Sequence, residues 1–195
     1  MFKNQIDLIH SLTDRQMIQQ LYMTQTVLAA AGLAGSWLFL GDVLAPAEKL
    51  SVTLPALLSG IGLAGLAVAA DYAVTNKVPA GWYDDGGVNE KLFRSCSIPH
   101  IALMAAIIAF TEEWLFRGVL QTEFGLLAAS LIFSILHLRY LTKPLLFAMV
   151  TAVSLLIGLL YEMTDNLFAV MTAHFLIDFI FGIQIRVKYV NRGET

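Results

Sequence analysis

The sequence predicts an all-α polytopic membrane protein of about six transmembrane helices, and two observations lead to this fold class. Of 195 residues, 57% are hydrophobic and only 14% are charged, with a mean hydropathy of +0.70, whereas a soluble domain carries charge on about a quarter of its positions. The 27 charged residues, 12 Lys and Arg with 15 Asp and Glu, also gather at intervals and leave long apolar stretches suited to a bilayer core.

This composition excludes a soluble enzyme and a disordered chain. The formal net charge of -3 also argues against a nucleic acid partner, which would require a basic face. Cys96 is the one cysteine, so it cannot form an intramolecular disulfide.

The gaps between charged groups locate the spans, because a helix needs about 17–25 apolar residues to cross a bilayer. Residues 1–20 precede the first gap and place apolar residues at helical spacing, so they are expected to form a cytoplasmic leader or an interfacial helix. Residues 21–195 are expected to form a single transmembrane domain with the catalytic site inside the helix bundle. The six predicted spans are 21–40, 51–70, 97–121, 124–138, 144–160 and 166–185.

Small residues in the second span predict a close contact with another helix. They are Gly60, Gly62, Ala64 and Gly65.

The positive residues predict the orientation, because cytoplasmic flanks collect Lys and Arg. With six spans and the N-terminus inside, only Lys49 and Arg117 fall toward the other side. Both termini are therefore expected in the cytoplasm of a multi-pass cell membrane protein. The cytoplasmic flanks would hold Lys3, Arg15, Lys77, Lys91, Arg94, Arg139, Lys143, Arg186, Lys188 and Arg192.

Ionisable side chains inside the spans cost several kcal/mol and usually mark function. Counting a rise of 1.5 Å per residue from the nearest predicted turn places Glu112, His137 and His174 at depths of about 13, 18 and 12 Å, with Asp178 one turn deeper. Four polar side chains on three helices are thus expected in one slab near the middle of the membrane.

The spacing of these residues suggests how they interact. Glu113 and Arg117 are four residues apart and are expected to form a structural pair, while Glu112 is turned about 100° away from Glu113. His174 and Asp178 are also four apart, so the carboxylate could hold the tautomer and orientation of the imidazole.

Phe133 lies one turn before His137 and could form a wall of its pocket. A carboxylate and two imidazoles in a water-poor setting suit amide hydrolysis, in which water must lose a proton and an oxyanion must be stabilised.

Three motifs in this order resemble the CPBP intramembrane proteases, also called the ABI or CAAX-protease family, over about residues 97–185. That family includes eukaryotic prenyl-protein endopeptidases and bacterial relatives associated with bacteriocin processing or self-immunity. The resemblance implies an endopeptidase of the bacterial plasma membrane, in contact with membrane lipid, that acts on a membrane-associated protein or peptide. The motifs are Glu112-Glu113-x-x-x-Arg117, Phe133-x-x-x-His137 and His174-x-x-x-Asp178.

The resemblance also implies a role for each residue: Glu112 and His137 activate water, His174 and Asp178 stabilise the oxyanion, and Glu113 and Arg117 support the site. An ionised aspartate cannot donate to an oxyanion, so Asp178 is either protonated or orients His174. A glutamate and two histidines could also bind zinc. They come from three separate helices without a compact His-Glu-x-x-His run, so we expect metal-free catalysis and no cofactor.

Two other functions would use the same buried polar cluster. A non-enzymatic membrane regulator or immunity protein would use it for binding. A proton-coupled transporter would use it as a relay, although the inverted repeats of many transporters are not visible in the sequence.

Overall fold

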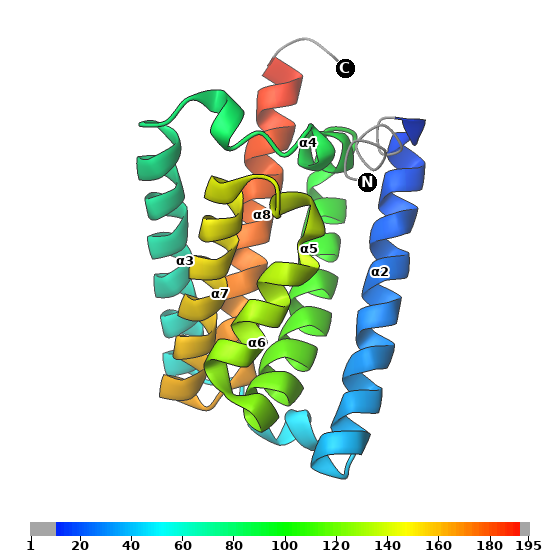
Figure 1. Ribbon diagram of the computed structural model, residues 1–195, viewed down its shortest axis with the longest axis vertical. Helices are drawn as coiled ribbons and strands as arrows, with labels where there is room; N and C mark the ends of the chain where they lie inside the picture. Colours follow the sequence, from blue (N-terminus) through cyan, green and yellow to red (C-terminus); the bar gives the residue numbers. More distant parts are fainter. Residues whose placement is uncertain (1–10, 192–195) are drawn as a thin grey trace.

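The computed structural model describes residues 11–191, and within that range every regular element is a helix (Figure 1). The predicted all-α fold class is therefore confirmed. The elements are α2 (Asp14–Gly35), η1 (Ser36–Leu40), η2 (Ala45–Lys49), α3 (Leu54–Thr75), η3 (Ala80–Trp82), α4 (Val88–Phe93), α5 (Ile98–Glu113), η4 (Trp114–Gln121), α6 (Thr122–Leu136), η5 (Leu138–Tyr140), α7 (Pro144–Thr164) and α8 (Leu167–Asn191).

The long helices begin at residues that satisfy their free backbone N–H groups. Thr13 caps α2 in a reciprocal capping box, because its hydroxyl accepts from the Gln16 N–H and the Gln16 side chain accepts from the Thr13 N–H. Ser97 caps α5 in a similar way and is followed by a proline in the first turn. Residues 14–20 thus lie in the same helix as the first predicted span, and residues 1–10 lie outside the described residues.

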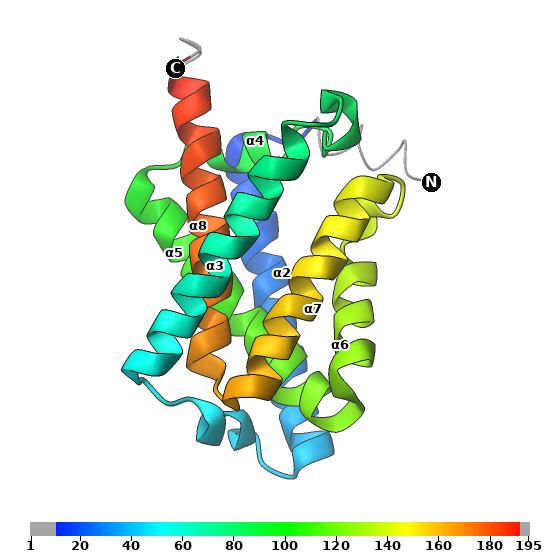
Figure 2. The same ribbon diagram turned by 90° about the vertical axis from the view of Figure 1, so that its left-hand side faces the viewer.

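Five helical stretches of the described chain are long and apolar enough to cross a membrane, where the sequence predicted about six. The difference lies in the 39-residue stretch Ile98–Leu136, which contains two of the predicted spans. Gly125 interrupts it with φ 81° and ψ 169°, a backbone conformation that glycine adopts readily. The chain reverses there, so that α6 packs back against η4 (Figures 1 and 2). After Gly125, α6 extends only to Leu136, which is about 16 Å of helix.

Helix α8 packs against α3, α5 and α7, while α2 packs against α5 and η4 (Figure 2). Small residues allow the close approach of α3 to α8. A Cβ atom added at Gly60 would lie 2.5 Å from the carbonyl oxygen of Ala169 on α8, and Ala64 is buried in the same interface. The predicted contact is confirmed for these two residues but is wrong for Gly62 and Gly65, which have nothing within 4 Å of such a Cβ. Gly60 and Ala64 are four residues apart and therefore lie on the same face of α3, the face that meets α8.

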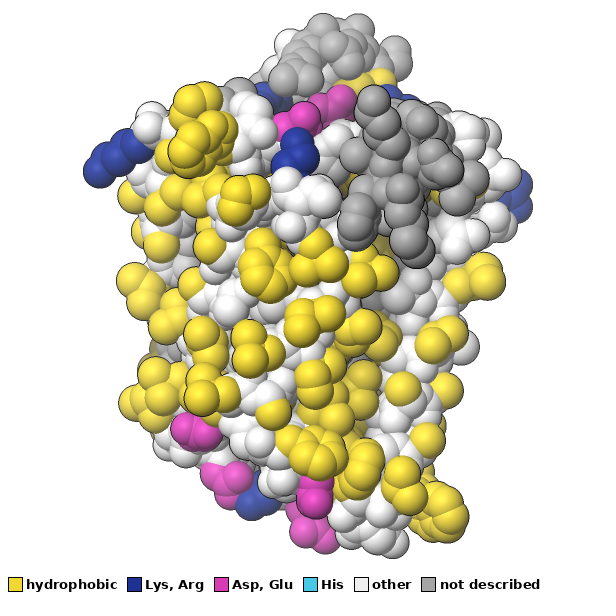
Figure 3. Space-filling model, viewed as in Figure 1, with side chains coloured by type: hydrophobic (Ala, Val, Ile, Leu, Met, Phe, Trp, Pro, Cys, Tyr) yellow, Lys and Arg dark blue, Asp and Glu magenta, His cyan; other side chains and the backbone are white. Residues whose placement is uncertain are grey.

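The two ends of the bundle differ in charge. The first turn of α2 and the last turn of α8 lie at the same end (Figure 1), and Lys and Arg side chains are visible at that end in Figure 3. At the other end, Lys49 pairs with Asp165 at 2.5 Å. Several acidic side chains are visible at this end in Figure 3. Hydrophobic side chains cover much of the surface between the two ends, as expected for a surface that faces lipid (Figure 3).

We predict that Gly60→Leu destabilises the protein. A side chain at this position would overlap the backbone of α8, and such overpacking costs typically about 1–3 kcal/mol. Gly62→Leu on the same helix is the matched control, because its added side chain meets open space. Thermal unfolding of the purified variants in detergent measures the difference. Equal melting temperatures for the two variants would contradict the α3–α8 contact.

Candidate active site

The six ionisable side chains predicted inside the spans come from three parts of the bundle. Glu112 and Glu113 end α5, and Arg117 follows in the π-helical segment η4. His174 and Asp178 lie one turn apart on α8, and His137 ends α6. A π-helical turn is wider than an α-helical turn and is frequent at functional sites.

The Glu113 carboxylate lies at the centre of the cluster and has no exposed surface. Its Oε1 accepts hydrogen bonds from Arg117 Nη1 at 3.3 Å and from His174 Nδ1 at 2.6 Å, and its Oε2 forms an ion pair with Arg117 Nε at 3.2 Å. Arg117, 1% exposed, also donates from Nη2 to the carbonyl and the hydroxyl oxygen of Ser154 on α7. The predicted Glu113–Arg117 pair is therefore present, and hydrogen bonds connect it to α7 and α8.

His174 is oriented by Glu113 rather than by Asp178. Its Nδ1 donates to Glu113, so its Nε2 points to the other two carboxylates, at 3.5 Å from Asp178 Oδ2 and 3.9 Å from Glu112 Oε2. The expectation that Asp178 sets the imidazole tautomer is wrong on this point. Residues one turn apart share a helix face, but a residue from another helix makes the shorter contact.

Glu112 faces away from the Glu113–Arg117 pair, as the 100° rotation predicts. Its Oε1 accepts from Gln25 Nε2 on α2 at 3.1 Å, and Oε2 faces His174. The carbonyl oxygen of Gln25 in turn accepts a hydrogen bond from the Thr111 hydroxyl. Gln25 was not among the predicted site residues, although a single glutamine within the apolar stretch 21–40 indicates a buried amide.

His137, the residue after the last turn of α6, lies beside the Phe133 ring. Its Nδ1 is 2.9 Å from the Phe133 carbonyl oxygen, and because a carbonyl only accepts, Nδ1 carries the proton and Nε2 is free to accept one. The Phe133 ring contacts both imidazoles, with centroid distances of 4.7 Å to His137 and 6.2 Å to His174. Among the described residues, His137 makes no hydrogen bond or ion pair with Glu112, so the two groups expected to activate water are not bonded to each other.

Within residues 11–191, no three His, Cys, Asp or Glu side chains come together in a way that could hold a metal ion. In both histidines of the site one ring nitrogen is engaged by an acceptor, an arrangement that histidines have with or without a bound metal. The expectation of metal-free catalysis therefore stays a prediction.

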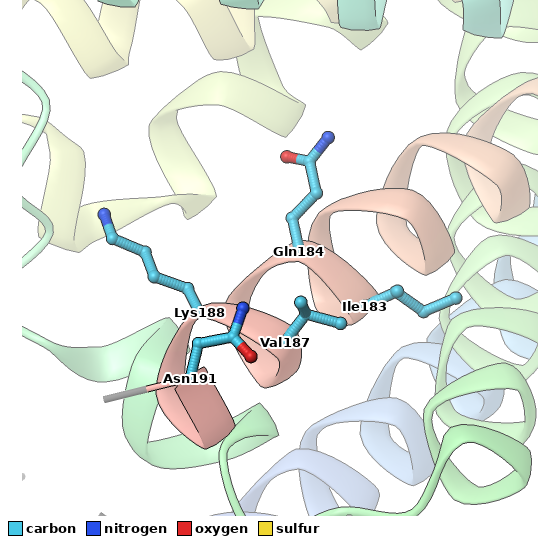
Figure 4. Close-up of a pocket in the computed structure, with 5 residues that line it drawn as sticks. All are labelled: Ile183, Gln184, Val187, Lys188 and Asn191. Atoms are coloured by element: carbon cyan, nitrogen blue, oxygen red, sulfur yellow. The ribbon is translucent and has the colours of Figure 1, made fainter. Parts of the chain in front are cut away.

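A hollow near the end of α8 is separate from the site. Figure 4 shows that it is lined by Ile183, Gln184, Val187, Lys188 and Asn191, which all come from this one helix.

The chain is similar to known proteins over the region that contains the cluster. A family model described as type II CAAX prenyl endopeptidase Rce1-like matches residues 94–180. A relative from Bacillus subtilis (strain 168), named uncharacterized protein YpbD, is 49% identical over 173 residues, which cover 88% of this chain and 92% of the relative. The chain belongs to the Rce1-like family. No solved structure matches it.

The matched residues 94–180 span the positions of all three predicted motifs, from Glu112 to Asp178. The expected CAAX-protease resemblance is thus confirmed, with nearly the predicted extent. Helices α2 and α3 lie outside the match.

We predict that Arg117→Met strongly destabilises the protein, because it leaves the Glu113 carboxylate buried without its guanidinium. Loss of one partner of a buried ion pair costs about 3–5 kcal/mol. A double variant, Glu113→Gln with Arg117→Met, removes both charges and is expected to recover part of that loss. Lys49→Met breaks the exposed ion pair with Asp165 and is the control, with little change expected.

Thermal unfolding in detergent measures these effects. A double variant no more stable than Arg117→Met alone would show that the unpaired charge is not the cause of the loss.

Proposed function

We propose that this protein is an intramembrane endopeptidase, in which Glu112 and His137 activate a water molecule for attack on a peptide bond. Membership of the Rce1-like family supports a peptidase. The observation that carries the mechanism is the environment of Glu112: one carboxylate oxygen is held by Gln25, and the other faces a buried imidazole.

Water activation requires a base with a free lone pair close to the attacking oxygen. Glu112 Oε2 is such a group, and His137 Nε2 is a second, because Nδ1 is committed to the Phe133 carbonyl. A water molecule between the two side chains would give its proton to one of them as it attacks the carbonyl carbon. The same proton is then available to the leaving amine.

The oxyanion requires a hydrogen-bond donor, and His174 supplies one when both of its ring nitrogens are protonated. Three carboxylates and one guanidinium surround this imidazole, so a positive charge on His174 reduces the net negative charge of the cluster. In this proposal, Asp178 acts on the oxyanion through His174. It can therefore stay ionised, because it does not need to donate a hydrogen bond itself.

The substrate is proposed to be a membrane-associated protein or peptide, and the location a bacterial plasma membrane with both termini in the cytoplasm. The basic connections at the end of the bundle that carries the first turn of α2 and the last turn of α8 support this orientation. The hydrophobic surface between the ends supports direct contact with lipid.

We predict that Glu112→Gln abolishes cleavage, with a loss of at least about 10³-fold, while insertion in the membrane is unchanged. Loss of a proton-transfer group costs about 10²- to 10⁴-fold, and His137→Ala should lose activity within that range. Peptides from membranes of cells that carry wild-type or Glu112→Gln protein are compared by mass spectrometry for fragments that depend on Glu112. Glu162→Gln, at an exposed position of α7, is the control.

Full proteolysis by purified Glu112→Ala protein would rule out this mechanism. If instead Glu112→Gln protein showed no loss of its biological function in cells, a binding role for the cluster would be favoured.

The absence of a cofactor is a separate prediction. Purified protein dialysed against a chelator is expected to retain its cleavage rate, and added zinc is expected not to increase it. A loss of activity with the chelator that zinc restores would require a metal-dependent mechanism.

A further inference from the structure

We infer that Gln25, on a helix outside the family match, is a positioning residue for Glu112. This inference rests on the proposed hydrolytic function of Glu112 and adds a part of the site that the three motifs do not contain. Gln25 is 6% exposed and lies on α2, whereas all residues of the motifs lie between Glu112 and Asp178.

The direction of the two hydrogen bonds defines what Gln25 does. An ionised carboxylate only accepts, so the amide must present Nε2 to Glu112 Oε1 and Oε1 to Thr111. The Thr111 hydroxyl then donates to the amide oxygen. The backbone carbonyl oxygens of Ile107 and Ile108 lie 2.9 and 3.2 Å from the Thr111 hydroxyl oxygen and are alternative acceptors for the same proton. The ionised Glu112 carboxylate therefore selects the orientation of the amide, and the Thr111 hydroxyl can satisfy the amide oxygen that this orientation turns toward it.

This arrangement makes the two oxygens of Glu112 unequal. Oε1 is occupied by the amide of α2, while Oε2 lies 3.9 Å from His174 Nε2, and Asp178 Oδ2 lies 3.5 Å from the same nitrogen. Oε2 is thus the oxygen left for the proposed activation of water. Without Gln25, the plane of the carboxylate could rotate about the last bond of the side chain, and the lone pairs of Oε2 would not keep a fixed direction.

A second buried glutamine, Gln121, illustrates a different role, which is to join two helical elements. Gln121, 5% exposed, donates from Nε2 to the backbone carbonyl of Gly158 and so joins η4 to α7. Gln25 is bonded instead to two side chains, one of which is the proposed base. A residue that only joined helices would affect stability, whereas a positioning residue affects the rate of the chemical step.

The test compares Gln25→Met, which keeps the length of the side chain and removes both hydrogen bonds, with Gln20→Met at an exposed position of the same helix. Hydrogen bonds to charged groups are the stronger kind, so kcat for Gln25→Met is expected to fall by about 10- to 100-fold with KM nearly unchanged. Thr111→Val should lower kcat in the wild-type background but have little further effect in Gln25→Met. Gln20→Met should behave as wild type.

Chemical modification gives a readout that does not depend on proteolysis. A hydrophobic carbodiimide modifies buried carboxyl groups, and mass spectrometry measures the rate at Glu112. We expect a several-fold change in that rate in Gln25→Met and none in Gln20→Met. An unchanged rate and an unchanged kcat in a stable Gln25→Met protein would overturn the inference. A different outcome is a modification rate that changes in Gln25→Met while the wild-type protein cleaves no membrane peptide. That outcome would support the positioning of Glu112 and overturn the proposed function.

Discussion

The Glu113 carboxylate has no contact with solvent, and much of the bundle is arranged to stabilise it. An isolated charge in such a place costs several kcal/mol, so it must be paired and hydrogen-bonded. Arg117 supplies the opposite charge from the next turn, and His174 supplies a second donor from α8. Because Arg117 has further donors, it also binds Ser154, which brings α7 into the same network. The buried charge on α5 is thus connected to η4, α7 and α8.

The same carboxylate determines the chemistry beside it. Glu113 accepts a hydrogen bond from Nδ1 of His174, and this contact turns Nε2 toward Glu112 and Asp178. The two adjacent glutamates therefore have different partners, although their side chains are identical. Glu113 is engaged by Arg117 and His174, while Glu112 keeps one oxygen directed toward the proposed site of hydrolysis. Their different surroundings, rather than their residue type, separate the supporting carboxylate from the proposed base.

The sequence alone predicted the helical class, most span boundaries and the residues of the cluster, because apolar stretches and the charges within them are local signals. It did not predict that Glu113 orients His174, since spacing within one helix favours Asp178 and says nothing about a side chain from another helix. The assignment of Gly62 and Gly65 to a helix contact was wrong for a similar reason: composition identifies a small-residue segment, but packing selects one face of it. Gln25 was missed because an uncharged amide does not interrupt an apolar stretch as a charge does.

The contacts of Glu112 and Glu113 also restrict how α5 can be placed. Consecutive side chains on a helix point about 100° apart, so two adjacent residues with fixed partners define the rotation of the helix about its axis. Glu113 is held by His174 on α8, and Glu112 is held by Gln25 on α2. A rotation of α5 that improved one contact would lengthen the other. Helix α2 therefore contributes to the geometry of a cluster whose motifs all lie on other helices, although α2 itself lies outside the matched region.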